Sequence, residues 1–120
     1  MSFIMIFLGG GLGALSRFLL IKLIDSYGFS SLSLGVLGVN ILGALALGFF
    51  LPWFKEGGRY LLFTVGFLGA FTTFSTYSFQ TFELIRKSLY LLAFMNILLN
   101  NVLSILAICI GRALSLFFFF

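Results

Sequence analysis

Long apolar runs separated by short polar breaks make up the whole chain. The breaks read DSYGFSS, KEGGR and ELIRK. An α-helix needs about 20 predominantly apolar residues to cross the hydrocarbon core of a bilayer. The pattern therefore predicts an all-α membrane protein with four transmembrane helices, at about 3–24, 34–54, 60–82 and 89–111. The first run has no basic leader, so we expect a membrane helix there and not a cleavable signal.

Composition supports this class and narrows the function. The chain has 120 residues, of which 62% are hydrophobic and 8% are charged, and its mean hydropathy is +1.24. So few charges cannot cover a water-soluble core, and we expect one transmembrane domain over residues 1–120. Histidine is absent, and the single cysteine, Cys109, fits a small core residue of the fourth segment. Since the three carboxylates lie near segment ends, we expect no enzyme and no transition-metal site.

The positive charges are balanced across the predicted membrane. With four spans, one side receives the N-terminus, Lys55, Arg59 and Arg112, whereas the other receives Lys22, Arg86 and Lys87. A chain without a Lys/Arg bias carries no strong instruction for one orientation. Either both orientations occur, which permits an antiparallel homodimer, or the N-terminal amine or Arg17 decides the orientation.

Small residues follow the pattern of close-packed membrane helices. Gly9 and Gly13 form one small-xxx-small pair, and Ala44 and Gly48 form another. Such pairs let helix backbones approach closely. A bundle of four helices packed in this way has little room for a solute path, so we expect the protein to form oligomers.

Two polar residues lie inside the first two segments. Arg17 costs about 2.5 to 3.5 kcal/mol at a helix centre on insertion scales. It either faces a wet cavity, with an anion as a candidate partner, or extends its long side chain to the nearer interface. Asn40 needs partners for its amide, and it serves either to join helices or to line a polar path.

A polar stripe runs along the fourth segment. Asn96, Asn100 and Ser104 recur every four residues, so they share one helix face. Ile108 ends the stripe, and Asn101 lies about 100° around the helix from Asn100. Because this face cannot point to lipid, it either joins helices or lines a solute path.

The third segment contains GAFTTFSTYSFQ, residues 69–80, in which hydroxyls alternate with aromatic rings. Gly66, Gly69 and the clustered Ser/Thr residues weaken helix continuity. A broken membrane helix is tolerated where its free backbone groups are satisfied, and unwound carbonyls there commonly coordinate a cation. We therefore expect a break near 69–73, close to the middle of the membrane. The alternative is a continuous helix whose hydroxyls bond back to its own carbonyls.

Two aromatic rings follow this expected break on one helix face, at Phe74 and Tyr77, and Ser75 and Ser78 share another. Ring edges are positive and suit a small anion, whereas ring faces suit a cation. Arg17, the amides and the hydroxyls are all donors, and no carboxylate lies deep enough to favour a cation. Together these features favour an anion path.

Three motifs resemble, in order and spacing, those of the fluoride channel family, known as Fluc or CrcB. They are GGGLGALSR, GVNILGA and GAFTTFSTYS, in the first, second and third segments. The resemblance covers essentially the whole chain, and the third motif is the most specific. It implies an antiparallel, dual-topology dimer with two fluoride pores and a central structural Na⁺ held by backbone carbonyls at the breaks of the two third helices.

The resemblance also assigns roles to individual residues. The sodium-binding carbonyls fall on Gly69 and Thr72. For the fluoride pathway, the resemblance implies ring edges at Phe74 and Tyr77, a vestibule arginine at Arg17, a pore asparagine at Asn40 and a fourth-helix polar track at Asn100 and Ser104. We expect the hydroxyls of Ser75 and Thr76, next to the rings, to belong to the same pathway.

Three positions depart from the family pattern. Tyr77 stands in place of the second phenylalanine and adds a hydroxyl, Gln80 stands where the family usually has a glutamate, and Ile108 replaces a hydroxyl of the fourth-helix track. These departures leave the conduction rate open, and they leave open a heterodimer in which another subunit supplies a competent pore.

The expected function is selective, passive export of fluoride from the cytoplasm across the inner (plasma) membrane. A competing hypothesis is a proton-coupled small multidrug exporter, which requires a membrane-embedded carboxylate that the first segment lacks. Two further hypotheses are one subunit of a heterodimeric fluoride channel and a non-transporting assembly subunit, although the latter leaves the polar stripe and Arg17 without a role.

Overall fold

Every regular element in the described part of the chain is a helix. The computed structural model describes residues 1–28 and 32–120, so Phe29 to Ser31 of the predicted first break lie outside the described residues. The first two helices are α1 (Ser2–Asp25) and α2 (Leu34–Phe50). The third segment is divided into α3 (Gly57–Arg59), η1 (Tyr60–Leu68), α4 (Gly69–Phe71) and α5 (Phe74–Arg86). The chain ends in α6 (Tyr90–Phe119).

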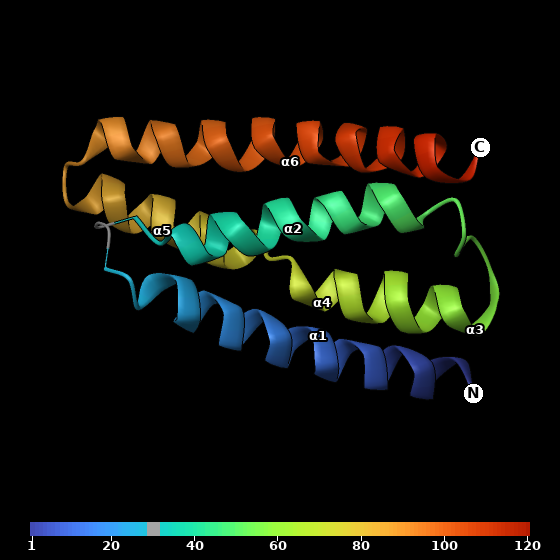
Figure 1. Ribbon diagram of the computed structural model, residues 1–120. Helices are drawn as coiled ribbons and strands as arrows, with labels where there is room; N and C mark the ends of the chain where they lie inside the picture. The colour runs from blue at the N-terminus through green and yellow to red at the C-terminus, as the bar shows by residue number, and fades with distance from the viewer. Residues whose placement is uncertain (29–31) are drawn as a thin grey trace.

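The segments run back and forth beside one another, so that both termini lie at the same end of the molecule (Figure 1). Three of them, Ser2–Asp25, Gly57–Arg86 and Tyr90–Phe119, are long and apolar enough to cross a membrane, and Leu34–Phe50 is a shorter apolar helix. The prediction of an all-α protein with apolar helices is therefore confirmed for the described residues.

Burial is arranged as in a protein surrounded by lipid. Asn96 and Asn100 are buried, with 1% and 5% of their surface exposed, whereas Phe7 and Leu91 on the outside are 79% and 74% exposed. In lipid, apolar surface gains nothing by burial, so polar contacts and close packing hold the helices together. The interior of this chain accordingly includes buried polar side chains, whereas many large apolar side chains lie on its surface.

Glycines bring the helix backbones into contact. A Cβ on Gly9 or Gly13 of α1 would overlap the backbone of η1, and a Cβ on Gly48 of α2 would overlap the Ile108 carbonyl of α6. Gly111 of α6 meets the Leu45 carbonyl in the same way. The two predicted small-residue pairs thus serve packing within one chain, through Gly9 and Gly13 against η1 and through Gly48 against α6.

Several helix bounds differ from the predicted spans. The second helix ends at Phe50 and not near residue 54, because Pro52 has no N–H to donate to the Gly48 carbonyl. The third segment starts at Gly57, three residues before its predicted start. The last helix extends to Phe119 and not to 111, since a single charge at Arg112 does not end an otherwise apolar helix.

The charge pattern predicted a loop at ELIRK, and this prediction is wrong. Helix α5 continues to Arg86, and the turn to α6 is confined to Lys87, Ser88 and Leu89. Arg86 donates two hydrogen bonds to the Glu83 carboxylate, from Nε at 3.1 Å and from Nη2 at 2.7 Å. Pairs three residues apart favour the helix, and Ser88, with a φ of 60°, makes the turn.

The expected interruption of the third helix is confirmed, and the alternative of a continuous helix is wrong. Thr72 (φ −80°, ψ 155°) and Thr73 (φ −145°, ψ 120°) are extended and separate α4 from α5. The Thr73 side chain caps α5 by accepting a hydrogen bond from the Thr76 N–H at 3.2 Å. The break is therefore two residues long.

The segment before the break is a π-helix, which the sequence pattern did not indicate. η1 covers Tyr60–Leu68, and the Gly69 N–H at its end donates to the Thr64 carbonyl, five residues earlier. π-Helices are rare and are frequent near functional sites. Gly66 packs this wide helix onto α1, where an added Cβ would crowd the Ile6 carbonyl oxygen.

Candidate functional site

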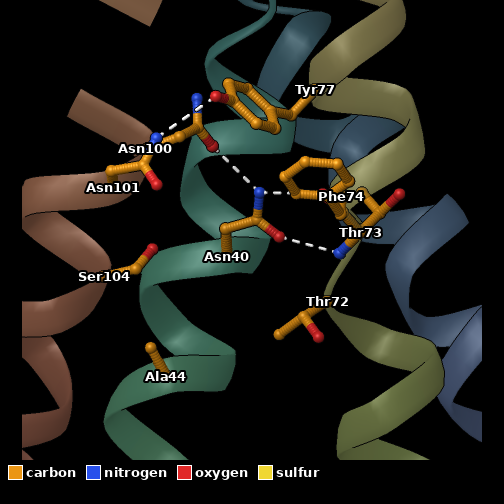
Figure 2. Close-up of a pocket in the computed structure, with 9 residues that line it drawn as sticks. All are labelled: Asn40, Ala44, Thr72, Thr73, Phe74, Tyr77, Asn100, Asn101 and Ser104. Atoms are coloured by element: carbon orange, nitrogen blue, oxygen red, sulfur yellow. Dashed lines mark hydrogen bonds between the residues drawn. The ribbon is translucent and has the colours of Figure 1, made fainter. Parts of the chain in front are cut away.

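A polar cavity of about 230 Å³ lies where α2, the break, α5 and α6 meet. Figure 2 shows its side chains projecting from these separate segments toward one another. The cavity is lined by Asn40, Ala44, Thr72, Thr73, Phe74, Tyr77, Asn100, Asn101 and Ser104. Five of the eight predicted pathway residues, namely Asn40, Phe74, Tyr77, Asn100 and Ser104, therefore lie around one cavity.

Asn40 ties the break to the rest of the bundle. Its Oδ1 accepts a hydrogen bond from the Thr73 N–H at 2.8 Å, and its Nδ2 donates to the Thr73 carbonyl at 3.1 Å. The same Nδ2 donates to Asn100 Oδ1 at 2.9 Å. One side chain thus satisfies both backbone groups of an extended residue and joins three segments (Figure 2).

The amide chain continues from Asn100 into the protein. Asn100 Nδ2 donates to the carbonyl and the Oδ1 of Asn96, at 3.0 and 2.9 Å. Asn96 Nδ2 donates in turn to Thr81 Oγ1 at 3.0 Å and to the Tyr77 carbonyl at 3.4 Å. The predicted stripe therefore has two parts. Asn96 joins α6 to α5, whereas Asn100 and Ser104 also line the cavity.

Phe74 and Tyr77 form an aromatic pair at the mouth of the cavity. Their ring centroids are 5.4 Å apart and their planes meet at 69°, which is an edge-to-face arrangement. Phe74 is 77% exposed on the single chain, whereas Tyr77 is 9% exposed. One wall of the cavity therefore ends in a ring that this chain leaves uncovered.

The two expected cation ligands lie at a second cavity of about 280 Å³, which Gly43 and Leu47 of α2 also line. Gly69 and Thr72 line it together with Thr64, whose Oγ1 is buried and has no partner among the described residues. In a continuous helix the Gly69 and Thr72 carbonyls would accept from the N–H groups of residues 73 and 76. Those N–H groups bond to Asn40 and to the Thr73 hydroxyl instead.

Three predicted pathway residues do not line the cavity. Arg17 is half-buried on α1, and it has no hydrogen bond or salt bridge within the part of the chain that the structure describes. Ser75 is exposed, and the Thr76 hydroxyl accepts a hydrogen bond from Thr73 Oγ1 at 3.0 Å. Ser75 and Thr76 lie off the cavity because a helix with Phe74 and Tyr77 on it directs residues 75 and 76 elsewhere, and their place on a fluoride pathway stays a prediction.

Two of the positions that depart from the family pattern, Gln80 and Ile108, lie outside the cavity lining. Gln80 Oε1 is buried without a partner among the described residues. Ile108 does not line the cavity, and its backbone packs against Gly48.

Sequence reasoning missed two contributors to the site. Thr73 is the residue that Asn40 holds, and Asn101 bonds to the Tyr77 hydroxyl at 3.2 Å. Thr73 could have been found as an N-cap, since a threonine commonly precedes the first turn of a helix. The sequence pattern gave no reason to assign Asn101 to the site, because residue 101 lies about 100° around the helix from the polar stripe.

The cavity offers neutral hydrogen-bond donors and no full charge. None of the described residues that line it is acidic or basic. The N-terminus of α5 also starts at this wall, and helix N-termini favour anions. The arrangement suits a small anion that passes through, since neutral donors replace water around an ion without trapping it.

Comparisons with known proteins agree over nearly the whole chain. A family model described as CrcB-like protein, Camphor Resistance (CrcB), matches residues 4–112. A protein of a Nitratiruptor species named "Fluoride-specific ion channel FluC" is 41% identical over 111 residues, which cover 88% of this chain and 87% of the relative. Proteins with the same name come from Pyrococcus abyssi, 35% identical over 117 residues (93% and 94%), and Campylobacter jejuni, 39% identical over 107 residues (86% and 88%).

Replacing Asn40 by leucine tests its role at the break. Asn40→Leu removes three hydrogen bonds and leaves the Thr73 N–H and carbonyl unpaired, at about 1 to 3 kcal/mol for each buried group. We expect a lower thermal stability in detergent and faster hydrogen–deuterium exchange in the peptide that contains Thr73. Asn101→Leu is the matched control and leaves exchange at Thr73 unchanged. Equal exchange in the two variants contradicts the role of Asn40.

Proposed function

The chain belongs to the CrcB-like protein family, and we propose that it is a fluoride-selective ion channel through which fluoride leaves the cytoplasm passively. The carrying observation is the cavity between α2, the break, α5 and α6, which combines aromatic rings with neutral donors and has no charged lining residue. The protein is a multi-pass membrane protein. Relatives named as ion channels agree with the expectation that it is not an enzyme.

Passive flow suffices for this function. Fluoride enters cells as neutral HF and is present in the cytoplasm as the anion. An inside-negative membrane potential drives an anion outward by about 2.3 kcal/mol per charge for each 100 mV. We propose that the protein lies in the inner (plasma) membrane, where such a potential exists. We also propose that the shorter helix α2 crosses the membrane together with the three longer segments, which gives four crossings.

Proton-coupled export fits this chain poorly. The carboxylate of the first helix is Asp25, which is its last residue. Asp25 accepts hydrogen bonds from the Gly35 N–H at 2.8 Å and from the Ser33 hydroxyl at 2.6 Å. It therefore caps α2 at the end of the bundle and does not lie at the cavity.

We propose that two copies assemble in opposite orientations. The balance of Lys and Arg across the membrane permits both orientations. The uncovered Phe74 ring, 77% exposed, leaves the cavity wall incomplete in a single chain. A second copy against this face would close the path. Pairing with a different subunit is the other outcome of the orientation test below.

We also propose a structural Na⁺ at the break. The Gly69 and Thr72 carbonyls have lost their helical donors, and the buried Thr64 hydroxyl lies at the same cavity without a described partner. Oxygen ligands of this kind suit a hard cation. Gly69 and Thr72 would hold the ion through their carbonyls, and the ion would supply positive charge that compensates those oxygens.

Fluoride efflux from liposomes that contain the purified protein tests the function. We expect rapid fluoride release and no chloride release, each followed with an ion-selective electrode. Phe74→Ile should reduce fluoride efflux to the level of empty liposomes, because it removes the ring from the cavity wall. Phe79→Ile, which changes an exposed ring outside the cavity, is the matched control and keeps normal flux. Trapped fluoride, or equal chloride release, would refute a selective channel.

Removing sodium tests the cation site. We expect replacement of Na⁺ by N-methyl-D-glucamine on both sides to lower the thermal stability of the assembled protein and its fluoride flux. Returning Na⁺ should restore both, and K⁺ should restore neither. Stability and flux that stay the same without Na⁺ would rule out the site at Gly69 and Thr72.

The orientation in the membrane can be read with a protease-sensitive tag on the C-terminus. Dual topology predicts that about half of the tags are cleaved from outside in intact cells, since each antiparallel pair exposes one C-terminus on each side. Full protection or full cleavage would show one orientation and would favour a partner subunit.

A further inference from the structure

The geometry points to the Tyr77 hydroxyl as a hydrogen-bond donor to the anion in the cavity, with Asn101 as the residue that directs its proton. This inference rests on the proposed function, because it assigns a role to a side chain on the fluoride path. Tyr77 is the position where this chain has a tyrosine hydroxyl and the family pattern has a phenylalanine.

The orientation of the Asn101 amide is fixed by its second partner. Asn101 Nδ2 lies 2.7 Å from the Ile97 carbonyl oxygen, which can only accept. The atom at that position must therefore be the amide nitrogen. The same Nδ2 lies 3.2 Å from the Tyr77 hydroxyl oxygen and donates its other proton to it.

The Tyr77 hydroxyl is consequently an acceptor toward Asn101, and its own proton remains available. No described residue accepts that proton, since the hydroxyl makes one hydrogen bond and receives it. Tyr77 itself lines the cavity. Asn101 thus leaves the phenol proton for a group that enters the cavity, and Figure 2 shows the Asn101 and Tyr77 side chains joined by their hydrogen bond.

The other side-chain donors around the cavity are already in use. Both protons of Asn40 Nδ2 go to Thr73 and Asn100, and those of Asn100 Nδ2 go to Asn96. The Thr72 hydroxyl donates to the Leu68 carbonyl at 3.1 Å. The Thr73 hydroxyl donates to Thr76. The amides therefore hold the protein together and cannot turn to an anion without breaking that network.

Ser104 is the other lining side chain with an unused proton. Its Oγ is buried and has no partner in the described chain. It projects from α6, as Asn101 does, into the cavity that Tyr77 also lines. Tyr77 and Ser104 are thus the two side chains of this cavity that can donate to fluoride without a rearrangement.

A pair of neutral hydroxyls suits fluoride. Fluoride is small and accepts strong hydrogen bonds, and each hydroxyl can replace one water of its hydration shell along the cavity. The absence of a charged lining residue keeps the ion from being held too tightly to leave. Larger halides gain less from the same two donors, so the hydroxyls contribute to selectivity as well as to entry.

Tyr77→Phe tests the donor while keeping the ring. We expect the fluoride concentration for half-maximal efflux to rise about tenfold or more, as the loss of one hydrogen bond to an anion predicts. Flux at saturating fluoride should stay close to that of the unchanged protein. Tyr90→Phe, which changes an exposed tyrosine outside the cavity, is the matched control and keeps the original half-saturation. An unchanged half-saturation in Tyr77→Phe, or a faster flux at low fluoride, overturns the inference.

Asn101→Leu tests the positioning role. We expect a rise of a few fold in half-saturating fluoride when Tyr77 is present and no further rise in the Tyr77→Phe background. A merely structural role of Asn101 would give the same loss in both backgrounds, and that result overturns the positioning role.

A binding measurement separates this inference from the proposed function. Fluoride added to the assembled, unmodified protein should shift the infrared phenol C–O band of one tyrosine, and chloride should leave it in place. A fluoride-specific shift without flux would refute the channel and retain the donor. Flux without a shift would retain the channel and refute the donor, and this readout needs no variant that has to fold.

Discussion

Two residues of extended backbone inside a helical membrane protein set the main physical constraint on this structure. Backbone N–H and carbonyl groups surrounded by lipid cost several kcal/mol each when they are unpaired. Asn40 meets this cost at Thr73 by bonding to its N–H and its carbonyl. The amide chain through Asn100 and Asn96 then fixes where Asn40 can lie. The part of the polar interior formed by Asn40 and Asn100 thus stabilises the break.

The same break creates one helix end with partial negative charge and one with partial positive charge. The carbonyl end of α4 offers Gly69 and Thr72 at one cavity, and the N-terminus of α5 starts at the other. Carbonyl ends favour cations and N-termini favour anions. One interruption of one helix therefore supplies the environment for both proposed ions, without a charged side chain at the anion cavity.

Much of this arrangement could be predicted from the sequence, because membrane segments, glycine contacts and the break depend on local composition. The four apolar segments and the position of the break followed from hydropathy and from the Gly and Ser/Thr residues of 66–76. Arg17 could not be placed, since its helix face depends on packing against η1. The direction of the Tyr77 proton was also beyond the sequence, because it depends on a second hydrogen bond of Asn101 to Ile97.

The π-helix η1 connects the surface that packs on α1 to the break, and its winding sets the rotation of the chain between the two. Each residue of an α-helix turns the chain by about 100°, whereas a wider helix turns it by less. The nine residues of η1 therefore determine the direction in which Thr72 and Thr73 emerge. A regular α-helix of equal length would present Thr72 and Thr73 at a different angle to Asn40. The length and winding of Tyr60–Leu68 thus help to set the orientation of the residues at the break.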